Sequence, residues 1–149
     1  MKYYWMALFS ALSYFSCSQP RKAVNSISCS SKIELQYDRT SSKGVMAKRD
    51  QKKVTVFFLN YFYDSIKVYI NGNLKFQDFV VTDTVSGKSN KSFSYDYSDD
   101  RMMPIMKVES NNGNCFDIQI SENYKLVYLF LDDKKNWTIR YSNKYYVDN

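Results

Sequence analysis

The chain of 149 residues contains no histidine. Histidine is the usual general base, the usual activator of a serine or cysteine nucleophile, and the commonest zinc ligand. With four glycines in all, the chain also has no glycine-rich loop of the kind that cradles phosphates. These absences predict a protein that binds without catalysing, with no cofactor and no bound metal.

Carboxylates are the groups that remain for acid–base or metal chemistry, and one cluster of them stands out. Asp96, Asp99 and Asp100 lie close together beside Tyr95 and Tyr97. Such a group would ligate calcium or supply an acid and a base. Because calcium takes about six or more oxygen ligands and this spacing fits no known calcium loop, a solvated turn is the favoured interpretation and calcium binding stays open.

The apolar stretch at residues 3–15 is too short to span a bilayer and has the layout of an export signal. It follows the cation Lys2 and precedes a segment of small residues at 16–18. We therefore leave this leader out of the fold prediction.

The run ALSYFSCSQ around Cys17 resembles the relaxed lipobox of small lipoproteins from Bacteroidota. The resemblance implies that residues 1–17 are a lipoprotein signal and that Cys17 carries a lipid anchor at the outer membrane or in the periplasm. Cleavage after Ser18 is the alternative, and it would give a secreted protein. Residues 18–31 are polar and serine-rich, which predicts a tether ahead of a folded domain at 32–149.

The chain has three cysteines, and the leader accounts for Cys17 under either cleavage. Cys29 and Cys115 remain as an even pair, and an oxidising compartment permits a disulfide between them. The bridge would be worth about 4 kcal/mol in the chain-entropy model. Two separate thiols are the alternative.

Positive charge is in excess, with 21 Lys and Arg against 15 Asp and Glu and a formal charge of +6. An exported protein meets little nucleic acid, and the basic stretch at residues 40–53 has no interleaved aromatics, so we expect no nucleic-acid partner. A solvated loop is favoured, with anionic lipid head groups, lipopolysaccharide or an acidic partner as alternatives. The stretch is residues 40–53, with Lys43, Lys48, Arg49, Lys52, Lys53 and the single acid Asp50.

The segment at residues 54–76 gives the clearest strand signals. Residues 54–63 are apolar on both faces, which predicts a central strand, and Asp64 with Ser65 is expected to end it. The alternation of residues 66–71 predicts a second strand with one buried face. Asn71 and Gly72 both take positive φ at little cost, so they predict a type I′ hairpin to a third strand.

Similar patterns recur along the chain, with no helical period. Eight to ten short strands separated by turn signals predict an all-β fold, a single antiparallel β-sandwich, with a small closed barrel as the alternative. The other expected strands are residues 33–37, 79–81, 93–97, 115–120, 124–131, 137–142 and 145–147, with a weaker signal near Pro104.

Aromatic residues make up 17% of the chain, more than one small core is expected to bury. The hairpin sequence KVYINGNLKF resembles hairpins of sandwich modules that include lectin-like and carbohydrate-binding domains. Tyrosine and tryptophan are side chains against which sugars and proteins stack, although cross-strand pairing would also explain them. Tyr95, Tyr97, Trp137 and Tyr141 form the candidate binding surface, with Tyr61, Tyr63, Tyr145 and Tyr146 as further aromatics on strand faces.

Two hypotheses follow. The first is a binding module for a protein or glycan at the cell envelope, and an aromatic patch in a concave face would favour it. The second is a structural or accessory envelope subunit, or an inhibitor-like protein, and a flat apolar patch or an exposed edge strand would favour it.

Overall fold

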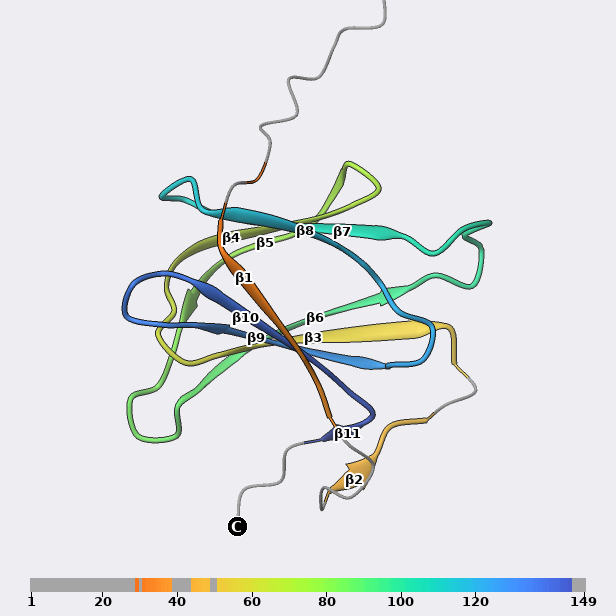
Figure 1. The fold of residues 1–149 in the computed structure, drawn as a ribbon, viewed down its shortest axis with the longest axis horizontal. Helices are drawn as coiled ribbons and strands as arrows, with labels where there is room; N and C mark the ends of the chain where they lie inside the picture. Colours follow the sequence, from red (N-terminus) through yellow and green to blue (C-terminus); the bar gives the residue numbers. More distant parts are fainter. Residues whose placement is uncertain (1–28, 30, 39–43, 49–50, 146–149) are drawn as a thin grey trace, which may run out of the picture.

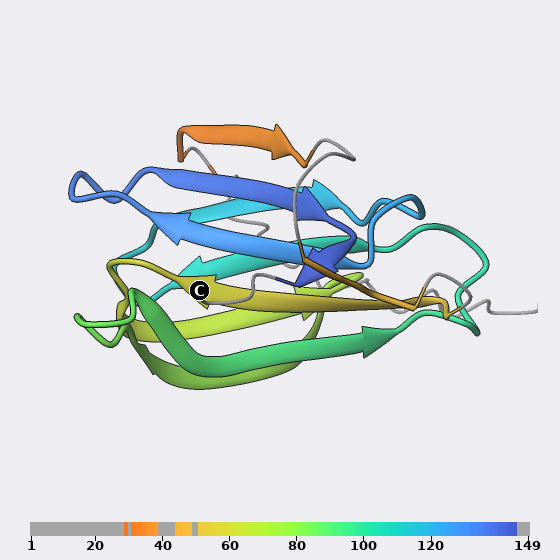
Figure 2. The same cartoon turned by 90° about the horizontal axis from the view of Figure 1, so that it is seen from below.

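A computed structural model describes residues 29, 31–38, 44–48 and 51–145. Across these residues the chain forms eleven β-strands, one more than the eight to ten that the sequence predicted, and no helix, which confirms the predicted all-β class. Two larger sheets pack face to face as a β-sandwich, and Figures 1 and 2 show its two layers. In the described part of the chain they remain separate sheets, so the alternative of a closed barrel is not formed.

The larger sheet has five strands in the order β1-β10-β9-β3-β6, which Figure 2 shows side by side. The pairs β1 with β10 and β3 with β9 are parallel, so this sheet is mixed, and the expected antiparallel pairing holds for its other two pairs but not for these. Alternation identifies a strand but does not fix the direction of its neighbours. The strands are β1 (Ile33–Tyr37), β3 (Lys53–Leu59), β6 (Lys88–Asp96), β9 (Leu126–Leu131) and β10 (Trp137–Ser142).

The second sheet has four antiparallel strands in the order β5-β4-β7-β8. Asn71 and Gly72 turn between β4 and β5 with φ of 49° and 79°, which agrees with the predicted hairpin. The strands are β4 (Tyr63–Ile70), β5 (Asn73–Val81), β7 (Ile105–Ser110) and β8 (Cys115–Gln119), and β2 (Val45–Met46) pairs with β11 (Lys144–Tyr145) in a small third sheet.

The break near residue 60 differs from its prediction. β3 ends at Leu59 and β4 begins at Tyr63, so Asp64 and Ser65 lie inside a strand instead of ending one. Asn60 and Tyr61 take φ of 34° and 61°, which redirects the chain from one sheet to the other. Asn60 is polar and common in turns, but the apolar and aromatic residues on both sides of it make the hydrophobic pattern resemble one continuous strand.

The main core fills the space between the sheets. Val56 of β3, Val68 of β4 and Ile139 of β10 are fully buried there, together with Trp137. β9 lies between β10 and β3, in the interior of the larger sheet. Its outer face is also covered, in a second cluster of Ala47, Leu59, Leu126 and Tyr128 with Phe57 and Phe130.

A disulfide joins Cys29 to Cys115 of β8, as predicted, with 5.0 Å between the Cα atoms. Ser31 supports the same junction, because its Oγ accepts a hydrogen bond from the Cys115 backbone N–H at 3.1 Å. Two residues of the expected tether are therefore attached to the sandwich. The export signal and Cys17 lie outside the described residues.

Candidate ligand-binding site

The predicted binding surface is mostly inside the protein. Trp137, Tyr97 and Tyr141 have exposed fractions of 0%, 3% and 4%, and Tyr95 is half-buried with its hydroxyl donating to Asp100 Oδ2 at 3.0 Å. Burial raises the pKa of Tyr141 to about 12. The alternating pattern correctly identified β10 as a strand. It does not say whether the face with the large aromatic side chains points to solvent or to the core, and in the structure these larger apolar side chains occupy the core. An exposed aromatic face of these residues was therefore a wrong prediction.

The acidic cluster after β6 is arranged as a turn. Asp96 Oδ1 accepts a hydrogen bond from the Ser98 backbone N–H at 2.9 Å, and this bond holds the pKa of Asp96 below its usual range. Asp99 is exposed, and Asp100 binds the Tyr95 hydroxyl. Among the described residues, no three His, Cys, Asp or Glu side chains gather closely enough to hold a metal ion.

The basic stretch is only partly described, since Lys43, Arg49 and Asp50 lie outside the described residues. Lys48 and Lys53 are exposed and line a cavity of about 300 Å³ beside β2. This arrangement fits the favoured interpretation of a solvated segment.

At the end of the sandwich on the left of Figure 1, the chain turns from β3 to β4 and from β5 to β6. A different set of residues, which belong to these turns, surrounds a larger cavity of about 560 Å³. This volume lies within the range of about 300–1,000 Å³ typical of ligand pockets. The turn between β3 and β4 forms one wall, and the turn between β5 and β6 forms the other. We call it the Tyr61 pocket, and it is lined by Asn60, Tyr61, Phe62, Tyr63, Thr82, Asp83, Thr84 and Gly87.

Hydrogen bonds join the two turns. Phe62 N–H donates to Thr82 Oγ1, and Thr82 N–H donates back to Phe62 O, both at 2.9 Å. Asn60 N–H donates to Gly87 O at 2.9 Å. Gly87 has φ of 67°, and a Cβ there would lie 2.9 Å from Asn60 Oδ1, so glycine allows the close approach. The two walls are thus held in a fixed relation.

Tyr61 occupies an unfavourable backbone region. Its φ of 61° is left-handed, a conformation that bulky L-residues seldom adopt. Its side chain is 62% exposed, so little packing of the ring compensates for the strain. Residues held this way cluster at ligand-binding and active sites, which marks Tyr61 as a candidate functional residue.

Asp83 is the charged group of the pocket. Its Oδ1 accepts hydrogen bonds from the backbone N–H groups of Val85 and Ser86, both at 2.8 Å, and from Ser86 Oγ at 3.2 Å. The bonds from Ser86 and Val85 lower the pKa of Asp83, so its carboxylate is ionised at neutral pH. In the described part of the chain, Oδ2 has no hydrogen-bond partner and is left as a free acceptor.

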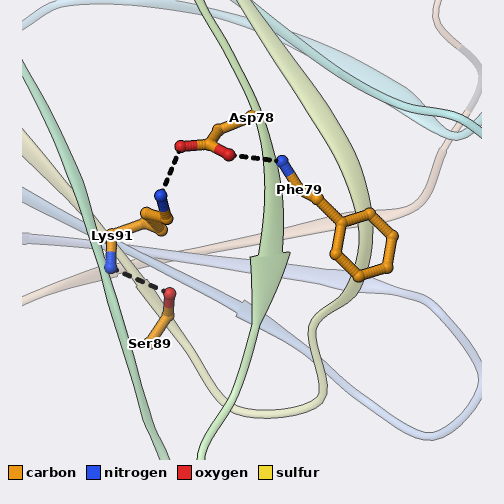
Figure 3. A network of polar contacts seen from close by, with 4 residues as sticks. All are labelled: Asp78, Phe79, Ser89 and Lys91. Atoms are coloured by element: carbon orange, nitrogen blue, oxygen red, sulfur yellow. Dashed lines mark hydrogen bonds and ion pairs between the residues drawn. The ribbon is translucent and has the colours of Figure 1, made fainter.

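Aromatic side chains continue from the pocket onto the outer face of β4 and β5. Tyr63 is 75% exposed, and its ring packs edge-on against Phe79 at 5.3 Å between centroids. Figure 3 shows how Phe79 is oriented: Asp78 points to β6, where its Oδ2 binds Lys91 Nζ at 2.6 Å, and the Phe79 ring points away from this ion pair. Asp78 Oδ1 also accepts the Phe79 backbone N–H at 2.8 Å.

The sequence identified Tyr61 and Tyr63 as surface aromatics but not as one site with Thr82 and Asp83, which lie about twenty residues further along the chain. A usable signal was the run from Asp83 to Gly87, because aspartate followed by serine and glycine is typical of a hydrogen-bonded turn.

No protein-family model matches this sequence, and no curated protein matches it. In the described residues, no helix is long and apolar enough to cross a membrane.

Proposed function

We propose that this protein is a non-catalytic binding module that recognises a glycan at the cell envelope through the Tyr61 pocket. The observation that carries the proposal is the pairing of exposed aromatic rings with polar groups around one cavity. The apolar face of a sugar ring stacks on tyrosine, while its hydroxyls bind nearby polar groups. Tyr61 and Tyr63 supply the rings, and Asn60, Thr84 and Asp83 supply amide, hydroxyl and carboxylate groups.

The pocket is better suited to binding than to hydrolysis. Glycoside hydrolysis normally uses two carboxyl groups that flank the scissile bond. Among the described residues that line the Tyr61 pocket, Asp83 supplies the single carboxyl group. Its pKa is lowered, whereas a general acid needs a raised pKa to keep its proton at neutral pH.

The location at the envelope rests on the leader and on the disulfide. The Cys29–Cys115 bridge is compatible with an oxidising compartment, as export would provide. We propose a lipid anchor on Cys17, with secretion after cleavage behind Ser18 as the alternative. The wild-type protein should fractionate with membranes, and Cys17→Ala should release it or block its maturation. Full-length soluble protein in the cytoplasm would contradict export.

Replacing Tyr61, one of the two tyrosines of the pocket, tests the function. Tyr61→Ala should weaken binding to polysaccharides by more than about tenfold, since aromatic anchors carry much of the energy of such contacts. Tyr69→Ala is the matched control, because Tyr69 lies on β4 but outside the pocket lining. Equal binding by wild type and Tyr61→Ala would refute the proposal. Tyr61-dependent capture of an envelope protein, with no glycan bound, would make the ligand a protein.

A separate observation favours the second candidate, an accessory subunit. Ile33, Leu35 and Tyr37 of β1 are 38%, 45% and 55% exposed and lie on the face that turns toward the core in β10. Contact with a second copy of the chain would cover them. Sedimentation of wild type and Leu35→Glu tests this, since a subunit contact predicts a wild-type dimer that the charged variant disrupts.

A further inference from the structure

The charge of the Tyr61 pocket is opposite to that of the whole chain. The protein carries a formal charge of +6, yet among the described residues that line the pocket none is lysine or arginine, and Asp83 carries the one formal charge. In the part of the chain that the structure describes, the groups that lower the pKa of the Asp83 carboxylate are hydrogen-bond donors of its own turn, with no cation among them. Net charge alone would have suggested an anionic ligand, and the pocket itself does not fit one.

We infer that the Tyr61 pocket selects neutral glycans, whose hydroxyls donate to Asp83 Oδ2, and rejects glycans that carry carboxylate, sulfate or phosphate groups; this inference rests on the glycan-binding function proposed above. A carboxylate oxygen accepts hydroxyl protons in charge-assisted hydrogen bonds that are roughly twice as strong as neutral ones. An anionic substituent would meet Asp83 without a cation to compensate. Rejection by an unpaired like charge is a common source of specificity.

The acceptor is held in place before any ligand arrives. Val85 and Ser86 occupy Oδ1 through three hydrogen bonds, so the carboxylate cannot rotate freely and Oδ2 keeps its direction. The same turn is attached to the Tyr61 turn through Gly87 and Thr82. A sugar that stacks on Tyr61 therefore meets an acceptor whose position is already set, and this lowers the ordering cost of binding.

The test uses Asp83→Asn, which keeps an oxygen to accept the bonds from Val85 and Ser86 but removes the charge. Asp99→Asn is the control with the same change in net charge, because Asp99 is exposed, follows the end of β6 at Asp96 and lies outside the pocket lining. The probes are a panel of neutral polysaccharides that includes dextran and mannan, and a panel of acidic ones that includes dextran sulfate and polygalacturonate. Each is measured against the full chain at moderate and at high salt.

We expect Tyr61-dependent binding in the neutral panel, insensitive to salt and weakened roughly five- to tenfold by Asp83→Asn but not by Asp99→Asn. Any binding of acidic probes should be independent of Tyr61 and should fall with salt, as expected for contact with the basic surface. Tyr61-dependent binding of an acidic glycan, unchanged or improved by Asp83→Asn, would overturn the inference and leave the glycan-binding function standing. Loss of Tyr61 dependence for every probe would overturn both.

Discussion

The strained backbone at Tyr61 gives a prediction in which stability and binding move in opposite directions. A left-handed conformation costs an L-residue about 1–2 kcal/mol, and glycine adopts it freely. Tyr61 has φ of 61° and a largely exposed ring, so its replacement removes little packing. Tyr61→Gly should therefore relieve the strain, whereas Tyr61→Ala should remove the ring and keep the strain.

The expected difference in stability between Tyr61→Gly and Tyr61→Ala follows from the relieved strain and from the entropy of the unfolded chain. Glycine raises the entropy of the unfolded chain, which costs about 0.4–1 kcal/mol relative to alanine. Subtracting this from the relieved strain leaves Tyr61→Gly more stable than Tyr61→Ala by about 1 kcal/mol. Tyr63 is the control, because it is also exposed, at 75% against 62% for Tyr61, but lies in β4 with extended backbone. There the order should reverse, with glycine less stable than alanine by about 0.5–1 kcal/mol.

Urea unfolding of the four variants measures these differences, provided that their m-values agree. Glycan binding, measured in parallel, should be lost in both Tyr61 variants. A Tyr61→Gly protein that is less stable than Tyr61→Ala would refute the strain. A Tyr61→Gly protein that is more stable but still binds would show that the strained tyrosine does not serve the ligand.

The core, the disulfide and one ion pair give further stability predictions. Trp137→Ala should lower the free energy of unfolding by about 3–5 kcal/mol because it leaves a cavity, and a loss under about 1 kcal/mol in urea unfolding would contradict its full burial. Reduction of the Cys29–Cys115 bridge, which spans a sequence separation of 86, should lower the free energy of unfolding by up to about 4–5 kcal/mol. A variant with both cysteines replaced by serine is the control, because reductant should not change its stability. Lys91 holds the pKa of Asp78 below its ordinary value of 3.8. The wild type should therefore be more stable than Asp78→Asn by a constant amount at neutral pH, and this difference should shrink as the pH falls below about 3.8. A difference that stays constant down to pH 2 would exclude this linkage.

Local patterns predicted the strands well because strand signals are local. The alternation in β10 and the pair Asn71 and Gly72 depend on neighbouring residues, and both were identified from the sequence. The turn at Asn60 was missed because an apolar run continues across it. Its cause is tertiary, since the chain changes sheet there and Phe62 binds Thr82 through two hydrogen bonds.

The binding site was harder to predict than the fold, for a related reason. Composition indicated surplus aromatics, but not which of them the core would take. Trp137 and Tyr141 have the aromatic character of a binding surface, but both are buried. Tyr61 and Tyr63 lie on either side of the buried Phe62, and both are exposed. Burial is decided by the pairing of the two sheets, and no window of neighbouring residues contains that information.

The misassigned tryptophan is nevertheless linked to the proposed site. Phe62 is 2% exposed, and its ring packs against Phe58 at 5.6 Å and against Trp137 at 5.9 Å between centroids. With Phe62 anchored in the core, Tyr61 and Tyr63 on either side of it stand out from the surface. The buried ring also supplies the packing that lets Tyr61 keep a backbone conformation it would otherwise avoid. The core at Trp137 therefore acts on the pocket through Phe62, without itself being accessible to a ligand.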